Sequence, residues 1–95
     1  MHVRLSNRAE ADLQEIKNYL EPLSRQGLER ILSAIRTTTG QLETFPLLGR
    51  HGRVEGTYEL TVPRTPFFIV YAIPDQIYID ILRVMHTARS YPFQT

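Results

Sequence analysis

The sequence predicts an α+β fold with the element order β-α-α-β-β-β, in which a helical hairpin packs on a small, mainly antiparallel sheet. Helical periodicity is confined to the first half of the chain, and apolar runs typical of strands fill the second half. Proline and glycine residues between the later runs leave only short connections, which join antiparallel neighbours. The length of 95 residues suffices for one hydrophobic core, so we expect a single domain over residues 1–95.

A short strand and a helix are expected at the start of the chain. Polar and apolar residues alternate over His2–Leu5, and Ser6 or Asn7 then supplies the oxygen that caps a helix. The helix should end near Glu21, because Pro22 disfavours helical geometry at the residue before it. The apolar stripe of this helix comprises Ala9, Leu13, Ile16 and Leu20.

A second helix follows, with Ser24 as its expected cap. Its apolar stripe comprises Leu28, Ile31, Leu32, Ile35, Thr39 and Leu42. The segment 37–40 is Thr-Thr-Thr-Gly, a poor helix sequence, which leaves the end of this helix open by several residues. A helical hairpin is the simplest arrangement of the two helices.

The second half of the chain reads as a glycine-rich loop followed by three strands. The segment Thr57–Val62 alternates as an amphipathic strand, whereas Phe67–Ile73 is apolar at every position. A strand of the latter kind must be covered on both faces or lie inside the sheet. The third run, Ile77–Met85, leads directly into His86 and Arg89. The end of this strand is therefore a rigid place to mount polar groups.

Composition excludes several classes of protein. Hydrophobic residues make up 42% of the chain and charged residues 22%, and no apolar run approaches the length that spans a bilayer. Charged residues interrupt the N-terminus before a signal peptide could form, so we expect a cytoplasmic protein with no membrane association. The chain has no cysteine, and its three histidines lack metal-ligand spacing. We therefore expect no disulfide, no metal and no cofactor.

The net charge argues against a nucleic-acid-binding protein. Eleven Lys and Arg face ten Asp and Glu, which gives a formal net charge of +1. Proteins that grip a phosphate backbone usually carry a pronounced basic excess. We expect no direct DNA binding by this chain alone, although the basic residues after Pro46 leave room for a local basic patch.

Short motifs along nearly the whole chain, from about Val3 to Arg89, together resemble one family. They are Ser6 with Ala9, Ala11-Asp12-Leu13, Ile16, Tyr19, Phe45-Pro46, Gly49-Arg50, Tyr58-Glu59-Leu60, Ile69-Val70-Tyr71 and Ile81-Leu82-Arg83-Val84-Met85-His86 with Arg89. In this order and spacing the chain resembles the RelE/ParE superfamily of toxins from bacterial type II toxin–antitoxin systems. The resemblance implies a toxin whose cognate antitoxin, encoded beside it, wraps the toxin and buries apolar surface.

Two mechanisms occur among the proteins that this chain resembles. ParE-like members poison DNA gyrase by binding, which needs no catalytic constellation; the candidate target-binding residues would be Arg83, His86 and Arg89. RelE-like members cut messenger RNA on the ribosome, where a base, an acid and cations assist attack by the ribose 2′-hydroxyl. No catalytic residue is firm here, but a nuclease could draw on Arg64, Arg83, His86 and Arg89, together with Glu59 and Tyr91.

Three features favour the ParE branch within this resemblance. The nuclease members are usually strongly basic, whereas this chain has a net charge of +1 and a single lysine, Lys17. The Val84-x-His86-x-x-Arg89 ending is commoner among ParE-like members. Tyr58 stands where many relatives carry an arginine before Glu-Leu, which removes one cation from a phosphate site. A member that only binds antitoxin, folded but harmless, stays open as a third interpretation.

Most of these residues also have a purely structural interpretation. His86 at a strand end is more often a hydrogen-bonded structural histidine than a general base. Arg89 could pair with Asp80, and Asp12 could be a helix N-terminal charge favoured by the macrodipole. Arg50, His51 and Arg53 are expected to be solvated turn residues. Core positions are expected for the aromatic residues Tyr19, Phe67, Phe68 and Tyr71.

Overall fold

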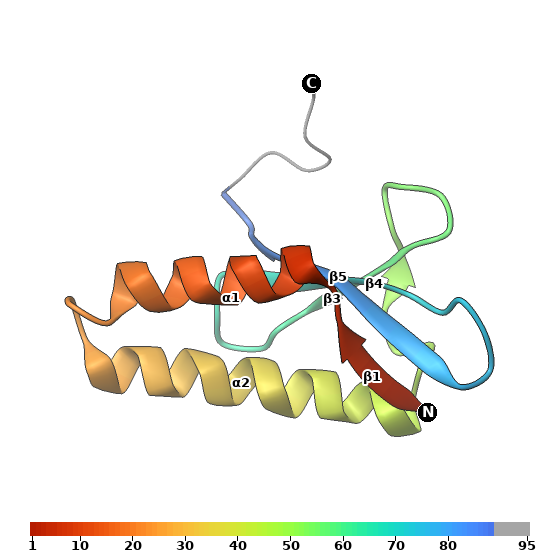
Figure 1. Ribbon diagram of the computed structural model, residues 1–95, viewed down its shortest axis with the longest axis horizontal. Helices are drawn as coiled ribbons and strands as arrows, with labels where there is room; N and C mark the ends of the chain where they lie inside the picture. Colours follow the sequence, from red (N-terminus) through yellow and green to blue (C-terminus); the bar gives the residue numbers. More distant parts are fainter. Residues whose placement is uncertain (89–95) are drawn as a thin grey trace.

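The computed structural model describes residues 1–88 and confirms the α+β hairpin-on-sheet fold (Figure 1). Its elements are β1 (His2–Leu5), α1 (Asn7–Leu20), α2 (Arg25–Thr44), β2 (Arg50–His51), β3 (Tyr58–Thr61), β4 (Phe67–Ala72) and β5 (Tyr78–His86). One strand, β2, lies in the segment that the sequence assigned to a loop. It escapes sequence patterns because it is only two residues long and pairs through its backbone with Glu59 and Tyr58.

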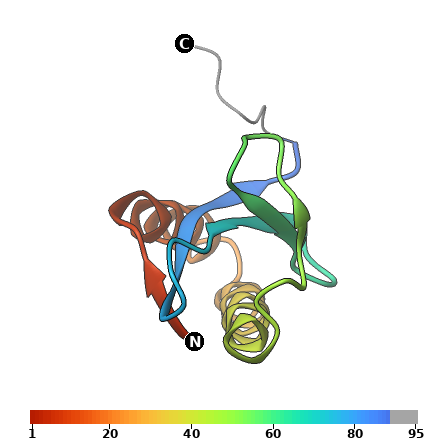
Figure 2. The same cartoon turned by 90° about the vertical axis from the view of Figure 1, so that its right-hand side faces the viewer.

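The sheet has the strand order β1-β5-β4-β3-β2 (Figure 2). The pairs β5·β4, β4·β3 and β3·β2 are antiparallel, as expected, whereas β1 runs parallel to β5. This parallel pair joins the start of the chain to its last strand, with His2 opposite Tyr78 and Leu5 opposite Ile81. The two apolar runs of the sequence thus become the two neighbouring central strands.

Both helices begin at the caps that the sequence indicated. The Ser6 hydroxyl accepts a hydrogen bond from the Ala9 N–H at 3.0 Å, and Ser24 does the same for Gly27. α1 ends at Leu20; Glu21 still has helical dihedrals, and the hydrogen-bond ladder stops at Pro22, which has no N–H. Within residues 1–88 no helix has both the length and the apolar character that a membrane crossing needs.

α2 runs through its weak helical segment without interruption. Thr38 is buried there, and its hydroxyl donates to the Ala34 carbonyl at 2.9 Å. Leu42, beyond the weak segment, is fully buried in the main core. Packing against the sheet therefore outweighs the low propensity of the threonines and of Gly40, and it extends the helix to Thr44.

β4 is covered on both faces, as its continuous apolar run predicted. Phe67, Ile69 and Tyr71 belong to the main core, which lies between the sheet and the two helices. Phe68 and Val70 point to the other face, where they join Met85 in a second, smaller cluster. β4 is therefore the structural centre of the sheet.

Tyr19 was expected in the core, and this prediction was wrong. Its side chain is 71% exposed, and that of Leu23 in the following turn is 66% exposed. The tip of the helical hairpin extends beyond the strands in Figure 1, so the last turn of α1 has no sheet beneath it. Helical spacing alone identifies a stripe but not where its cover ends.

The side chain of Tyr71 anchors the connection from α2 to β2. Its buried hydroxyl donates to the Pro46 carbonyl at 2.8 Å and accepts from the Gly49 N–H at 2.9 Å. Burial raises the pKa of this phenol, which keeps it neutral and able to donate. The backbone passes so close that a Cβ on Gly49 would lie 2.8 Å from the Tyr71 hydroxyl and from the Glu59 carbonyl.

We predict that Tyr71→Phe lowers the free energy of unfolding by about 1–3 kcal/mol, because a buried carbonyl and a buried N–H both lose their partner. Urea unfolding monitored by circular dichroism measures the change. Tyr19→Phe is the matched control, since the Tyr19 side chain is largely exposed and its loss of a hydroxyl should cost less than about 0.5 kcal/mol. Equal stabilities of the two variants would contradict the anchoring role.

Candidate functional site

Where β1 ends, residues at the start of α1 form hydrogen bonds with the same edge of β5. The Ser6 N–H donates to the Ile81 carbonyl at 2.9 Å, and the Ser6 hydroxyl donates to the Leu82 carbonyl at 2.9 Å. Asp12 then accepts the Val84 N–H at 2.9 Å through Oδ2. Ser6 and the helix residue Asp12 thus replace a missing strand beside β5 as far as Val84.

The same Asp12 carboxylate holds Arg83 in a two-point ion pair. Arg83 Nε lies 2.8 Å from Oδ2 and Arg83 Nη2 lies 3.0 Å from Oδ1. The side chains of Asp12 and Arg83 are only 7% and 13% exposed. Asp12 was interpreted as a helix N-terminal charge favoured by the macrodipole; it is instead the sixth residue of α1, buried and paired with Arg83. Arg83, a candidate for target binding and for catalysis, directs its guanidinium into the protein toward α1.

A β-bulge in β5 decides which face His86 occupies. Tyr71 pairs with Ile81 and Val70 with Arg83, so Leu82 between them has no partner on β4. Before the bulge Ile81 belongs to the main core on the helix side, and after it Val84 does. His86, two residues further on, therefore also faces the helix side of the sheet. There its ring meets the Phe67 ring edge-on at a centroid distance of 5.3 Å.

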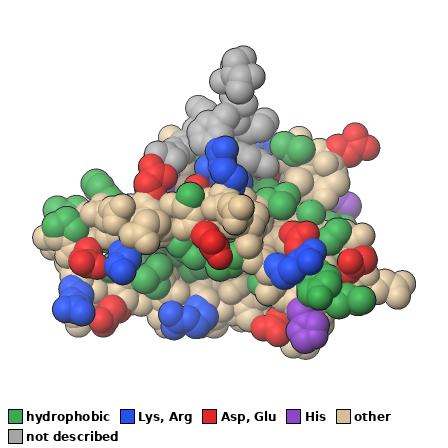
Figure 3. Space-filling view, viewed as in Figure 1, with side chains coloured by type: hydrophobic (Ala, Val, Ile, Leu, Met, Phe, Trp, Pro, Cys, Tyr) green, Lys and Arg blue, Asp and Glu red, His purple; other side chains and the backbone are tan. Residues whose placement is uncertain are grey.

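His86 lies in a groove of about 540 Å³ between the two helices and the ends of β4 and β5. The groove has an apolar floor and carries Asp12, Glu15, Arg30 and His86 as its charged or titratable residues. Its apolar lining comprises Ile16, Leu20, Ile31, Pro66, Phe67 and Val84. Figure 3 shows further apolar side chains at the hairpin tip, where Tyr19 and Leu23 are exposed. The groove and the tip together form the most extended apolar surface beside the strand end.

The end of β5 is held by two local hydrogen bonds. Nδ1 of His86 accepts from the Ala88 N–H at 3.0 Å, so the neutral imidazole carries its proton on Nε2. The Thr87 N–H donates to the Pro66 carbonyl at 2.8 Å. His86 is therefore held through Nδ1, and among residues 1–88 its Nε2 has no hydrogen-bond partner. Two further sequence candidates, Arg89 and Tyr91, lie outside the described residues.

Other sequence candidates lie apart from His86 or are engaged elsewhere. Arg64 occupies the turn between β3 and β4, and its carbonyl accepts from Arg30 at 3.4 Å. Asp80, named as a possible partner of Arg89, accepts two hydrogen bonds from Arg4 at 2.8 and 3.2 Å. Within residues 1–88 no group of three or more His, Cys, Asp or Glu could hold a metal ion.

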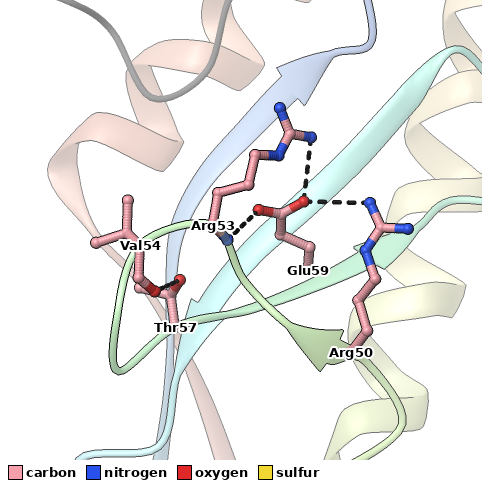
Figure 4. Close-up of polar contacts among 5 residues, drawn as sticks. All are labelled: Arg50, Arg53, Val54, Thr57 and Glu59. Carbon is pink, nitrogen blue, oxygen red and sulfur yellow. Dashed lines mark hydrogen bonds and ion pairs between the residues drawn. The ribbon is translucent and has the colours of Figure 1, made fainter.

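Glu59 forms a separate cluster, in which its side chain is only 2% exposed (Figure 4). It accepts from the Arg53 N–H at 2.9 Å, from the Arg53 guanidinium at 3.1 Å and from the Arg50 guanidinium at 3.4 Å. Arg50 and Arg53 were expected to be solvated turn residues; their side chains are 73% and 48% exposed, and both guanidiniums also pair with Glu59. They hold the loop that follows β2 onto β3 through one buried carboxylate.

The electrostatics of Glu59 make it a weak base. Burial alone would raise the pKa of Glu59, but the Arg53 N–H and the two guanidiniums outweigh burial and lower the pKa below its usual value of 4.5. A general base works best with a pKa near the working pH. This carboxylate therefore serves structure, and catalysis would have to use other groups.

Both ion-pair clusters were missed because their partners are recognisable only in three dimensions. Asp12 and Arg83 are 71 residues apart in the chain. One signal was present: Asp12 follows Ala9 by three residues and precedes Ile16 by four, so it lies on the buried stripe of its helix. A charge on a buried stripe indicates a paired charge.

Comparisons with known proteins agree on one family. Residues 3–91 match the model for the ParE toxin of the type II toxin–antitoxin system parDE. Y4kP, a candidate toxin of Sinorhizobium fredii, is 33% identical over 90 residues, which is 95% of this chain and 92% of Y4kP.

Two solved structures share the fold. The first is from the chromosomal ParDE toxin–antitoxin system of P. aeruginosa and is similar to this chain with a TM-score of 0.68. The two sequences are 27% identical, and the match covers 90% of this chain and 95% of that one. The second is from the toxin–antitoxin complex RelBE2 of Mycobacterium tuberculosis and is similar to this chain with a TM-score of 0.64. The two sequences are 31% identical, and the match again covers 90% of this chain and 95% of that one.

We predict that Asp12→Ala lowers the free energy of unfolding by about 3 kcal/mol, because it removes three hydrogen bonds that the buried carboxylate accepts from the Arg83 guanidinium and the Val84 N–H. Glu10→Ala, at an exposed position of the same helix, is the control and should cost less than about 1 kcal/mol. Urea unfolding compares both variants with the wild type. A loss below about 1 kcal/mol for Asp12→Ala would refute the bridging role.

We also predict that Glu59 contributes an acid-sensitive part of the stability. Because its pKa is lowered in the folded state, its stabilisation is present above its unfolded-state pKa and is lost as the pH falls through the folded-state value. Unfolding free energies measured from pH 7 down to acid pH should therefore fall more steeply for the wild type than for Glu59→Gln. Parallel curves for the two proteins would contradict this assignment.

Proposed function

The chain belongs to the ParE family of toxins from type II toxin–antitoxin systems, and we propose that it is a cytoplasmic poison of DNA gyrase that acts by binding. The match of the ParE model over residues 3–91 carries this proposal. The structural similarity to a protein of the P. aeruginosa ParDE system supports the same branch. We further propose that residues 1–95 act as one domain without a cofactor.

The state of the candidate catalytic groups supports binding rather than cleavage. Phosphodiester cleavage needs a base, an acid and cations gathered around one phosphate. Here Arg83 is paired with Asp12, and the Glu59 carboxylate is held by two arginines on another part of the sheet. A gyrase poison needs only a rigid contact surface. Among the predicted target contacts, we propose that His86 touches gyrase, that Arg83 supports it through Asp12, and that Arg89 continues the surface.

We propose a cognate antitoxin as the second partner. The similar structures come from a ParDE system and from a RelBE2 toxin–antitoxin complex. This chain exposes several large apolar side chains that a partner could cover. They are Leu5, Tyr19, Leu23, Phe45, Leu47, Leu48, Val54 and Ile77.

A ribosome-dependent mRNA endonuclease is the alternative function. The similarity to a protein of the RelBE2 complex, with 31% identity, favours it. In that case Arg64, His86 and Arg89 would have to supply the charges and the proton transfer, with Arg83 released from Asp12. A chain that only binds antitoxin would show neither activity.

We predict that the purified protein makes gyrase accumulate cleaved plasmid DNA, because a poison stabilises the covalent enzyme–DNA intermediate. The measurement is linear DNA released by detergent and protease from gyrase, ATP and supercoiled plasmid. His86→Ala should weaken the effect about tenfold, with an unchanged circular dichroism spectrum as the control for folding.

A parallel reaction with translating ribosomes tests the alternative. Shortened message there, abolished by His86→Ala, together with unaffected gyrase, would replace the proposed function by the nuclease. Growth that continues when the gene is expressed without an antitoxin would favour the harmless interpretation.

A further inference from the structure

We propose that the Arg30 and Arg64 cations, together with the His86 imidazole, form a corner beside the groove, which binds a segment of the toxin's protein target that presents a carboxylate next to a bulky apolar side chain. The inference rests on the proposed function, because it names the chemistry by which the groove would recognise that target. Hereafter "the cationic corner" means these three residues.

Arg64 stands in a backbone conformation that suits glycine. The turn 62–65 closes with a hydrogen bond from the Thr65 N–H to the Val62 carbonyl at 3.3 Å, and Pro63 occupies its second position. The third position of such a turn needs a positive φ, and Arg64 has φ 64°. Glycine or asparagine is usual there, and a side chain costs free energy. A strained residue that persists points to a function of its side chain.

Arg64 is joined to a second cation. The Arg30 guanidinium donates to the Arg64 carbonyl at 3.4 Å, so α2 brings another arginine to the strained turn. Neither arginine forms an ion pair with a carboxylate among residues 1–88. By contrast, Arg4, Arg53 and Arg83 all face carboxylates. Arg8, Lys17, Arg25 and Arg36 also form no ion pair with a described residue, but none of them lines the groove, whereas Arg30 does.

The corner adjoins the apolar groove. Arg30 and His86 line the groove directly, and so does Pro66, two residues after Arg64. The two carboxylates of the groove, Asp12 and Glu15, belong to α1 on its other side. A ligand would therefore place its negative group toward α2 and the turn.

This combination fits an acidic protein segment better than a nucleic acid. A phosphate backbone presents many charges and requires many free cations, whereas most arginines near the sheet are already neutralised by Asp12, Glu59 and Asp80. One local excess of positive charge suits one carboxylate. The apolar floor then suits an aliphatic or aromatic side chain next to it.

Arg64→Gly separates the proposed role from a structural one. Glycine relieves the strained φ, so the melting temperature should rise by roughly 4 °C, while ligand binding should weaken. A residue that merely supported the fold would lower both. Arg36→Gln is the control for charge. Arg36 is an exposed arginine of α2, the helix that carries Arg30, and it does not line the groove, so this change should alter neither the melting temperature nor ligand binding.

The probes are two peptides, acetyl-Glu-Leu-Phe-Glu-amide and its glutamine counterpart, titrated into the isotope-labelled protein by NMR. We predict that the wild type binds the glutamate peptide about tenfold more tightly than the glutamine peptide, with shifts at Ile16, Ile31 and His86. In Arg64→Gly the ratio should fall to about threefold or less. An unchanged ratio in that variant, or tighter binding of hexathymidylate at the same resonances, would overturn the proposal.

Binding to gyrase and to the antitoxin identifies the source of the segment. Arg64→Gly should bind immobilised gyrase more weakly than the wild type does, and it should bind the antitoxin as tightly as the wild type does. Weaker binding of the antitoxin with unchanged binding of gyrase would overturn the assignment to the target. A wild type that prefers the glutamate peptide but ignores gyrase would contradict the proposed function while supporting the chemistry of the corner. The two failures are therefore distinguishable.

Discussion

The carboxylate of Asp12 is the contact on which the working end of the molecule depends. It closes the edge of β5 where β1 stops, and it neutralises Arg83 with both oxygens. Without it the Val84 N–H would lose its acceptor, and the Arg83 guanidinium would lose the carboxylate that holds it close to the core. The bulge at Leu82 then turns Val84 and His86 to the helix side. One helix residue and one extra strand residue together place His86 in the groove.

Local patterns predicted the parts of the fold that depend on local physics. Ser6 and Ser24 cap their helices, Pro22 ends α1, and the apolar run of β4 is covered on both faces. The missed features depend on distant partners. Tyr19 is exposed because the sheet ends before the hairpin does, and the burial of Glu59 needs two arginines from a neighbouring loop. His86 could be named from the sequence, but the groove around it required the bulge and both helices.

The way in which charge is distributed explains how a nearly neutral chain can still have a distinct recognition surface. Three carboxylates, those of Asp12, Glu59 and Asp80, hold arginines from four different elements or loops. These pairs fix loops and strand edges. Because the paired arginines already contact a carboxylate, they are less able to bind a negatively charged ligand. Among the described basic residues without an ion pair, Arg30 lines the apolar groove and its guanidinium contacts the Arg64 carbonyl. Such a surface discriminates between protein partners without attracting polyanions in general.

Because β2 is so short, this edge of the sheet is a poor site for strand addition by other copies of the free protein. An open sheet margin invites strands of other copies to add to it, and long apolar margins seed fibres. β2 offers only Arg50 and His51 for such pairing, both with exposed side chains, and Glu59 holds Arg50 in place. Two polar residues are too short a template for a growing stack. At this edge of the sheet, a chain that leaves much apolar surface open for its partners is thereby protected against backbone pairing with other copies before it meets them.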